Sequence, residues 1–494
     1  MHKRTVPVLV IGAGPVGLST GLFLAHWGVP ALVAEKRPAI SDIPRASSSL
    51  RTLELFRLIG LGEAVARVGW RGGPPMRTVF KDTALGATLH RGGLPPRYER
   101  FLRECSPIDA RLIITHDQVQ RLALTESRRK GAEVRFGLEL LGLEHDADGV
   151  RALLVDRGTG AHWQITADYV IGADGANSTV RQALGITMPD REPIAPLHTV
   201  FFRADLGSAL RDWGTHMCFV RNDAVYATVM SKNGRDQWSS HIMDYPGKPE
   251  GAVPLTKAEA AELVRAALGD DTIPLEVHAV NGWEAAVGMA SSFRQGRIFL
   301  VGDAAHVQSS AGGLGMNTGI QDGHNLAWKI GAVRGGRFAP ALLDTYEPER
   351  RAAATASLAL SRGMHHGYRR LDGDPNALYD RIAADYLRAM LCYGYTTAPA
   401  PDVLDPTVRP GYRFPHRWVI DKISTLDLIG SRWTLLTGDD PEKWRTATES
   451  LGLPLPVGHL DDLDQTVLVR PDGFVAWAGS DEDSLRAALA PLLK

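Results

Sequence analysis

The sequence predicts an α/β protein in which a parallel sheet is joined by an inserted antiparallel sheet and by a separate C-terminal unit. A glycine-rich turn follows an apolar strand within residues 6–17, which is the arrangement that builds a parallel sheet with covering helices. Short β-rich runs separated by Asn-Asp and Asn-Gly turns fill residues 197–244, as in an antiparallel sheet. A proline-rich stretch from residue 397 precedes a third region with its own strand signals.

The first strand is predicted at Val6–Ile11, and the hexad that follows it, Gly12-Ala13-Gly14-Pro15-Val16-Gly17, matches the pattern G-x-G-x-x-G. In this pattern Gly12 allows the tight turn and Gly14 lets backbone N–H groups approach a pyrophosphate at the start of a helix. Gly17 allows the strand and the helix to pack closely. The turn therefore predicts a dinucleotide site.

A second strand is predicted at Ala31–Ala34, and it ends on Glu35, 21 residues beyond Gly14. A carboxylate that binds a ribose is expected at this distance from the glycine turn. A third strand is predicted to end at Gly172, with Asn177 or Ser178 as the cap of a helix that runs through Arg181. From the local pattern alone, Asp174 between them is either a turn residue or a ligand contact.

The most informative stretch is Gly296–His306, which continues into Gly312–Asn317. An apolar strand ends on Gly302-Asp303, a short loop follows, and a glycine-rich turn then opens a helix. Such an arrangement offers one carboxylate and a row of backbone N–H groups to a bound ligand.

The ordered set of motifs at Gly12, Asp174 and Asp303 resembles the single-component, para-hydroxybenzoate hydroxylase-like FAD-dependent aromatic monooxygenases. The resemblance covers nearly the whole chain, including Pro44-Arg45-Ala46 and Leu342–Arg351. The C-terminal residues resemble those of hydroxylases of aromatic polyketides, such as aklavinone hydroxylases. The resemblance implies a Rossmann-like FAD-binding domain at residues 1–190 and 280–395, to which part of 70–110 adds substrate contacts. It further implies a β-sheet substrate domain at 191–279 and a thioredoxin-like C-terminal domain at 396–494 that contains no cysteine.

By the same resemblance, Asp303 would bind the ribityl chain of FAD and Arg45 the pyrophosphate region, while Asp174 would connect the flavin site to the path of the nicotinamide cofactor. Backbone from Gly313 to Asn317 would lie against the isoalloxazine ring. The cofactor contacts expected in full are Gly12, Gly14, Pro15, Gly17, Glu35, Lys36, Arg45, His116, Gln118, Val134, Asp174, Asp303, Gly313, Leu314, Gly315, Met316 and Asn317.

Two departures from the family pattern leave alternatives open. His116 stands where the family usually has a glutamine that contacts the flavin, and Gln118 would point the same way from a strand but not from a helix. The loop before Gly312 is Val307-Gln308-Ser309-Ser310-Ala311 where the family usually has a Pro-Pro pair. The hydroxyls of Ser309 and Ser310, the candidates for a catalytic contact near flavin C4a, could bond a flavin peroxide, hasten its loss as H₂O₂ or face solvent.

In the resembled fold the inserted sheet covers the flavin, so Trp213, Tyr226 and Trp238 are candidates for the wall of an aromatic substrate site, although an ordinary sheet core explains them as well. The implied activity is hydroxylation of, or oxygen insertion into, a polycyclic phenol through a flavin C4a-hydroperoxide. FAD would be bound and O₂ consumed. NADPH or NADH would bind only transiently, because only one dinucleotide fingerprint is present. The alternative is a flavin oxidoreductase of the same fold that transfers no oxygen.

Composition narrows the classes of partner, metal site and cellular compartment that the chain could have. A net charge of −1 argues against nucleic-acid and membrane-surface partners, which usually need a concentrated basic excess. Cys105, Cys218 and Cys392 lie far apart and in no metal-ligand spacing, so no metal site is expected and a reducing compartment is favoured. The charged start Met1–Arg4 resembles a secretory signal, but glycines and His26 interrupt the apolar run. We therefore expect a cytoplasmic enzyme, a monomer or a homodimer, that acts on a small aromatic molecule.

Overall fold

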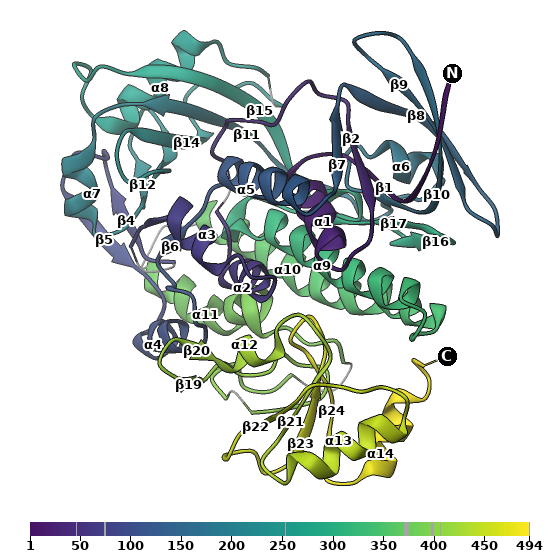
Figure 1. Cartoon of the computed structure of the whole chain (residues 1–494). Helices are drawn as coiled ribbons and strands as arrows, with labels where there is room; N and C mark the ends of the chain where they lie inside the picture. The colour runs from purple at the N-terminus through teal and green to yellow at the C-terminus, as the bar shows by residue number, and fades with distance from the viewer. Residues whose placement is uncertain are drawn as a thin grey trace.

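The computed structural model describes residues 1–45, 47–73, 76–251, 253–369, 375–396, 400–405 and 407–493. Ala46 of the arginine motif and residues 397–399 and 406 of the proline-rich stretch lie outside this description. Three large sheets occupy separate regions, with long helices between them (Figure 1). Among the described residues, no helix is both long and apolar enough to cross a membrane.

The first sheet is built from N-terminal and central segments. Its main path runs β16 (Arg294–Gln295), β17 (Ile298–Leu300), β10 (His162–Gly172), β1 (His2–Ile11), β2 (Ala31–Glu35) and β7 (Glu133–Phe136). The strands from β17 to β7 pair in parallel, while β9 (Val150–Asp156) and β8 (Leu138–His145) form an antiparallel extension from β10. The predicted strands before Gly12, Glu35, Gly172 and Gly302 are therefore neighbours. Because parallel strands end at one edge, their four loops meet there.

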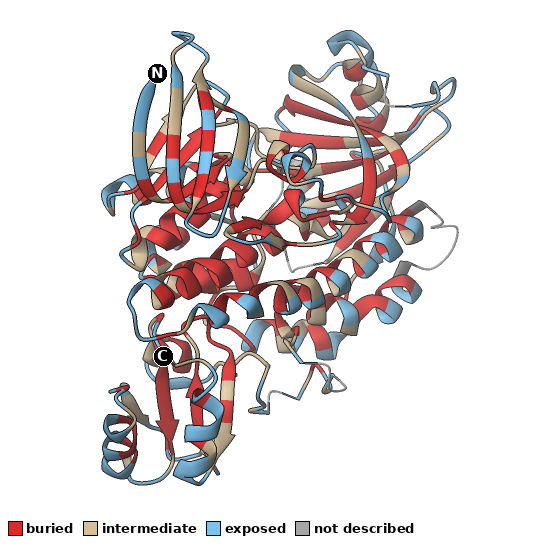
Figure 2. Ribbon diagram, turned by 90° about the vertical axis from the view of Figure 1, so that its right-hand side faces the viewer, coloured by how far each residue is buried: buried red, intermediate tan, exposed pale blue. Residues whose placement is uncertain are grey.

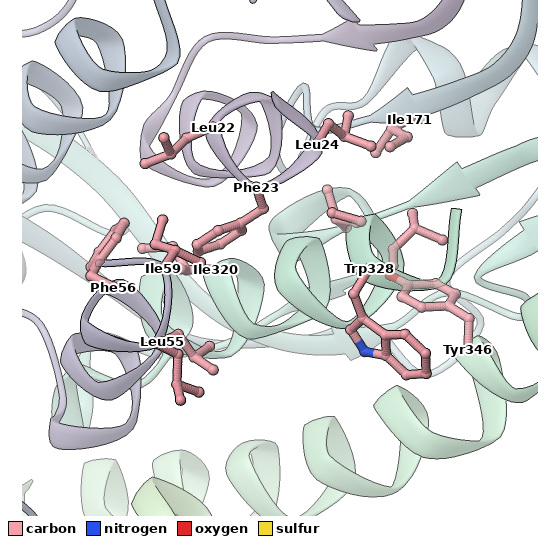
Figure 3. Close-up of a cluster of buried hydrophobic side chains, with 14 of the residues drawn as sticks. Leu22, Phe23, Leu24, Leu55, Phe56, Ile59, Ile171, Ile320, Trp328 and Tyr346 are labelled. Atoms are coloured by element: carbon pink, nitrogen blue, oxygen red, sulfur yellow. The ribbon is translucent and has the colours of Figure 1, made fainter. Parts of the chain in front are cut away.

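Helix α1 (Pro15–His26) packs between this sheet and helix α9 (Gly315–Arg334). Phe23 of α1 points toward Ile320 of α9 and lies 5.8 Å from the ring of Phe56 on α2 (Leu50–Leu58) (Figure 3). The close approach depends on small residues, since a Cβ on Gly323 would lie 2.1 Å from the hydroxyl of Thr20. Figure 2 shows that the central helices and the sheet interiors hold most of the buried residues. The core thus fixes where α9 begins.

The second sheet, which we call the lid sheet, has eight strands. Their order is β18 (His306–Val307), β15 (Glu276–Met289), β11 (Glu192–Arg203), β14 (Gln237–Asp244), β13 (Tyr226–Ser231), β12 (Met217–Arg221), β4 (Thr78–Lys81) and β5 (Thr88–Gly92). All described pairs are antiparallel except β12 with β4. Strand β15 continues past residue 279, where the sequence placed the edge of this region, because one long strand pairs with β11 along its whole length.

The remaining helices and small sheets support these two layers. The helices are α3 (Gly62–Val68), α4 (Pro96–Glu104), α5 (His116–Arg129), α6 (Thr179–Ala183), α7 (Gly207–Trp213), α8 (Lys257–Leu268), α10 (Tyr346–Arg369) and α11 (Pro375–Leu387). Strands β3 (Trp70–Arg71) and β6 (Leu112–Ile113) form a small pair. The predicted cap of α6 is confirmed, since the hydroxyl of Ser178 accepts from the Arg181 N–H at 2.9 Å.

The C-terminal unit holds a four-stranded sheet in the order β22 (Val457–His459), β21 (Thr434–Thr437), β23 (Thr466–Val469) and β24 (Val475–Gly479). Helices α12 (Thr425–Ile429), α13 (Pro441–Ser450) and α14 (Glu482–Leu489) and the hairpin of β19 (Trp418–Ile420) with β20 (Ile423–Ser424) surround it. Buried ion pairs join this unit to the rest of the chain: Arg413 binds Glu54 of α2, and Arg470 binds Glu349 of α10. The C-terminal unit is therefore held against the rest of the chain by buried arginines, each of which is neutralised by a glutamate on a helix of the main body.

Candidate functional site

Two connected hollows lie at the edge where the parallel strands end. A cleft of about 410 Å³ runs from the glycine turn past Glu35. A cavity of about 730 Å³ lies between α9 and the lid sheet. Arg45, Asp303 and Met316 line both hollows. A long ligand can therefore extend from the glycine turn into the cavity under the lid sheet.

The glycine turn is shaped for close approach of backbone. Gly12 has φ +103°, and a Cβ there would lie 2.4 Å from the carbonyl oxygen of Ala173. A Cβ on Gly17 would lie 1.9 Å from the Gly12 oxygen, so Gly17 serves packing and does not line the cleft. A Cβ on Gly14 would meet nothing within 4 Å, which leaves the first N–H groups of α1 open to the cleft. This geometry fits a pyrophosphate at a helix N-terminus.

Glu35 ends β2 beside the turn, as its spacing predicted. Its carboxylate accepts from the Ala13 N–H at 2.7 Å and from the Arg37 N–H at 2.9 Å. Lys36, Pro15 and Arg45 line the same cleft. Val134 does not, because it lies within β7 as the partner of Val33.

The structure separates the two candidates on α5. His116 is the first residue of the helix and lines the cleft; burial, together with the charges of Arg45 and Arg37, lowers its pKa to about 3. Gln118 faces elsewhere, since its side chain accepts from the Thr115 N–H and donates to the Val68 carbonyl, both at 2.9 Å. One turn beyond His116, Gln120 donates to the carbonyl of Ala13 at 3.1 Å. Gln120 lines neither hollow, but it shares the helix face of His116 and restrains the glycine turn from behind.

Asp174 and Asp303 bring two carboxylates to the site. One oxygen of Asp174 accepts from the Val180 N–H at 3.0 Å, while the other is buried without a partner among the described residues. Burial raises the pKa of Asp174. Asp303 is exposed and lines both hollows. Desolvation by the surrounding protein raises the pKa of its carboxyl, as does Asp322 nearby, and His306 opposes them. The unpaired atoms are suited to a hydroxyl-bearing ligand, which would supply the missing hydrogen bonds.

A buried network holds the turn that carries Asp303. Asp322 on α9 accepts from the Gly302 N–H at 3.0 Å, lies 2.7 Å from His306 Nε2 and accepts from Arg350 Nε at 2.7 Å. Burial alone would raise the pKa of Asp322, but the charges of His306 and Arg350 lower it. Arg350 belongs to the segment Leu342–Arg351, to which the sequence assigned no site residue. It positions the loop rather than touching the cavity.

The glycine-rich turn before α9 leaves an open surface. Gly312 and Gly313 have φ of +83° and +65°, and a Cβ on Gly313 would meet nothing within 4 Å. Leu314, Gly315, Met316 and Asn317 line the cavity. The Asn317 amide also accepts from the Ser49 N–H at 2.7 Å and donates to the Gly313 carbonyl at 2.7 Å. The open backbone leaves room for a flat ring, which is the contact that the family resemblance implies for Gly313–Asn317.

Helix α10 holds the Ser-Ser loop in place. Ser309 is buried, and its hydroxyl lies 3.0 Å from His365 Nδ1. Gln308 accepts from the Ser357 hydroxyl at 2.8 Å, and the Ser361 hydroxyl reaches the Ser309 carbonyl at 3.3 Å. Ser310 faces the cavity. The two serines stand where the family usually has a Pro-Pro pair, and bonds from α10 restrain the loop in place of prolines.

One face of the lid sheet forms the opposite wall of the cavity. Side chains alternate along each strand, so every second residue reaches this face. The cavity-facing residues of the lid sheet are Leu197, Thr199, Phe201, Met217, Phe219, Thr228, Met230, Ser239, His241, Met243, Asn281 and Trp283.

Two of the three aromatic residues expected on this wall, Trp213 and Trp238, lie in the core behind the lid sheet, which corrects the prediction for them. Trp238 alternates with Ser239, so it points into the core behind the sheet, where its N–H donates to the Ala204 carbonyl at 3.0 Å. Trp213 packs edge-on against Trp238 in that core, with ring centroids 5.9 Å apart. Tyr226 lies on the same strand face as Thr228 and Met230, and its hydroxyl donates to the carbonyl of Tyr368, a residue that lines the cavity. Strand parity, counted from Ser239 and His241, would have excluded Trp238 from the wall.

Comparison with known proteins places this geometry in a family. The profile described as FAD binding domain matches residues 5–361, and that described as Aromatic-ring hydroxylase, C-terminal, matches residues 407–493. Tetracenomycin B2 monooxygenase-dioxygenase of Streptomyces olivaceus is 36% identical, over 100% of this chain and 99% of its own. Aklavinone 12-hydroxylase of Streptomyces purpurascens is 32% identical, over 99% and 98%. The solved structure of aklavinone-11 hydroxylase with FAD and aklavinone has a TM-score of 0.87, 30% identity and full coverage of both chains.

Proposed function

Since the chain belongs to the family of FAD-dependent aromatic-ring hydroxylases and is an FAD-dependent monooxygenase, we propose that it hydroxylates a polycyclic phenol of the aromatic polyketide class. NADPH or NADH would supply the electrons and O₂ the oxygen atom. The names of the relatives support the substrate class, since the similar proteins act on tetracenomycin and aklavinone. A cavity of about 730 Å³ lies in the size range that suits a multi-ring ligand.

The observation that carries the proposal is the continuity of the cleft with the cavity at Asp303 and Met316. FAD in the cleft would place its pyrophosphate at the open N–H groups near Gly14 and its ribose at Glu35. Asp303 would accept from the ribityl chain and Asp174 would lie beside it. The isoalloxazine ring would then enter the cavity along Gly313–Asn317, facing the lid sheet.

Bound FAD, once reduced, supplies an electrophilic oxygen derived from O₂. The protein's own contribution is positioning and exclusion of water. The first N–H groups of α9 would stabilise negative charge at the flavin edge through the helix dipole. The loop at Ser309 and Ser310, held by α10, would fix the backbone next to the reacting carbon.

We further propose that different segments of the chain bind the cofactor and the substrate. Residues 1–190 and 280–395 would bind FAD, and the lid sheet, with its contribution from β4 and β5, would bind the substrate. Residues 396–494 would form a thioredoxin-like domain with a structural role. That unit contains no cysteine, so it cannot perform dithiol chemistry.

The test is turnover of phenolic polyketides by the FAD-loaded enzyme under ¹⁸O₂. A product heavier by one ¹⁸O atom, with substrate-dependent consumption of NAD(P)H, is the expected result. A mass change of two hydrogens without label would instead identify a flavin oxidoreductase that transfers no oxygen. Protein that binds no FAD after reconstitution would contradict both functions.

A further inference from the structure

A single band of polar side chains crosses the cavity face of the lid sheet. Cross-strand pairing places Asn281 opposite Thr199, Thr199 opposite His241, and His241 opposite Thr228. All four line the cavity. The rows beside this band are mainly apolar. Leu197 lies opposite Trp283 on one side, and on the other side Phe201 and Met230 flank Ser239. The wall thus combines surfaces for rings with one line of hydrogen-bonding groups.

A chain of hydrogen bonds orients the imidazole within this band. Trp283 Nε1 donates to Thr199 Oγ1 at 3.0 Å, and Thr199 Oγ1 lies 2.8 Å from His241 Nδ1. Because an indole N–H can only donate, the Thr199 oxygen accepts from it and keeps its own hydrogen free to donate to Nδ1. With that hydrogen directed at Nδ1, the hydrogen of the neutral ring sits on Nε2, for which no described residue supplies a partner. In this tautomer His241 presents an N–H donor to the cavity.

The charge near this donor is positive. Lys232, at the end of β13, is 7% exposed, lines the cavity and donates to the Arg45 carbonyl at 3.0 Å. It makes no ion pair with any carboxylate in the described part of the chain. Burial lowers the pKa of Lys232 to about 8, and the charge of Asp117 opposes that shift, so the ammonium is charged at and below neutral pH. His216 also lines the cavity, and its Nδ1 is buried without a partner among the described residues. Burial and the charge of Lys232 lower the pKa of His216 to about 4 and that of His241 to about 3, so both rings are neutral donors at neutral pH.

The other titratable groups on the wall do not cancel this charge. Asp303 is the only carboxylate among the described lining residues, and it lies where the cavity meets the cleft. Arg77 is neutralised by Glu99 at 3.0 Å, whereas Arg45 adds a second cation. His365 is bonded to Ser309. Burial raises the pKa of Tyr368, and raises that of Tyr386 to about 12, which keeps both phenols neutral.

We propose that His241 and Lys232 form a subsite for an ionised oxygen of the substrate, so that the enzyme selects polycyclic phenols that bind as phenolates. The inference rests on the proposed function for the ligand class and adds the recognised group. His241 Nε2–H donates to the oxygen, Lys232 supplies the compensating charge, and the phenol proton leaves to water. Ionisation raises electron density at the ring carbons ortho and para to the oxygen, where hydroxylation takes place.

The experiment uses 1,2-dihydroxyanthraquinone as a probe, because its visible absorption moves to longer wavelength on ionisation. It is titrated into the oxidised, FAD-loaded enzyme without NAD(P)H, and 1,2-dimethoxyanthraquinone serves as the matched ligand that cannot ionise. In the wild-type enzyme the bound probe should ionise at a lower pH than the free probe. The dihydroxy compound should bind at least about tenfold more tightly than the dimethoxy compound, as expected for a charged hydrogen bond.

His241→Phe and Lys232→Met should each abolish most of this preference and return the ionisation of the probe toward its free value. Thr199→Val should weaken it by releasing the ring tautomer. His278→Gln, on the same sheet but exposed beside Glu276, is the control and should change nothing. Because Lys232 also bonds to the Arg45 carbonyl, the flavin content of each variant is measured first. If Lys232→Met has lost FAD, the subsite is judged from His241→Phe alone.

A probe that ionises identically when free and bound, or a preference that survives in His241→Phe, would overturn the subsite. The outcome is independent of turnover. If the product contains no ¹⁸O but the probe shift is intact, the monooxygenase reaction is refuted and the subsite stands. If the product contains ¹⁸O but the probe shift is absent, the reaction stands and the subsite is refuted.

Discussion

Asp322 and Arg350 form an ion pair at 2.7 Å in which neither side chain is reached by solvent. The pair joins α9 to α10 directly beneath the turn that carries Asp303. The same carboxylate holds the Gly302 N–H and His306. A buried pair of this kind contributes little net stability when intact, but removing one partner leaves an uncompensated charge. Its role is to fix the turn in one position.

Asp322→Asn should therefore destabilise the protein by about 3–5 kcal/mol, because Arg350 would remain charged and buried without its carboxylate. FAD retention should fall as well, since the Gly302-Asp303 turn loses its anchor. Urea denaturation and the flavin content of purified protein measure the two effects. Asp344→Asn, at an exposed ion pair with Arg294, is the control and should cost much less. Equal effects of the two changes would contradict the role given to Asp322.

Asp303→Ala should weaken FAD binding by about 10- to 150-fold, the cost of losing a hydrogen bond to a charged group. The fold should tolerate the change, because Asp303 faces the hollows and makes no described side-chain bond that the turn depends on. Equilibrium dialysis of FAD against the apoprotein gives the dissociation constant. Asp271→Ala, on an exposed loop, should leave it unaltered. Unchanged flavin affinity in Asp303→Ala would remove this residue from the cofactor site.

Ser309→Ala should uncouple NAD(P)H oxidation from product formation. The change removes the contact with His365 and so loosens the loop by about 0.5–1.5 kcal/mol. We expect a larger share of the consumed NAD(P)H to appear as H₂O₂, measured by a peroxidase assay beside product mass. Thr355→Ala is the matched control, since the Thr355 hydroxyl is exposed on α10 and bonds to the Arg351 carbonyl of its own helix. If both variants leak equally, the bond to α10 is not what controls the loop.

Motifs with a fixed backbone geometry could be predicted from the sequence, whereas residues set by tertiary packing could not. The turns at Gly12 and Gly302 were predictable because their spacing demands positive φ or close approach, whatever the rest of the chain does. Trp238 was misplaced because a strand alternates its faces, and an aromatic ring suits a core as well as a wall. Arg350 and Ser309 were not identified as positioning residues because their partners, Asp322 and His365, lie tens of residues away.

Trp238→Phe tests the corrected position of that residue. The variant loses the bond to the Ala204 carbonyl and some core contact, so it should cost about 1–3 kcal/mol of stability. The KM for the phenolic substrate should stay close to the wild-type value, because the ring lies behind the sheet. Phe201→Ala, on the cavity face, should raise the KM. A raised KM in Trp238→Phe at unchanged stability would restore the wall assignment.

Buried neutral histidines predict a loss of stability on mild acidification. In the unfolded chain the pKa of a histidine is about 6.5. Burial lowers the pKa of His216 to about 4 and that of His116 and His241 to about 3. Below about pH 6.5 the unfolded chain therefore binds protons that the folded chain does not, so the free energy of unfolding falls as pH is lowered, by about 1.4 kcal/mol per pH unit for each such histidine.

The raised pKa of Asp174 and Asp303 acts in the opposite direction at lower pH, because these groups take up protons in the folded state first. The measurement is therefore confined to the interval between about pH 7.5 and about pH 5.5, where unfolded histidines titrate and carboxylates of ordinary pKa, about 4, remain ionised. Urea denaturation of the FAD-loaded enzyme across this interval should show a steady decline, which His241→Phe should reduce and His278→Gln should not. A free energy of unfolding that stays constant to about pH 5.5 would show that these rings titrate normally in the folded protein.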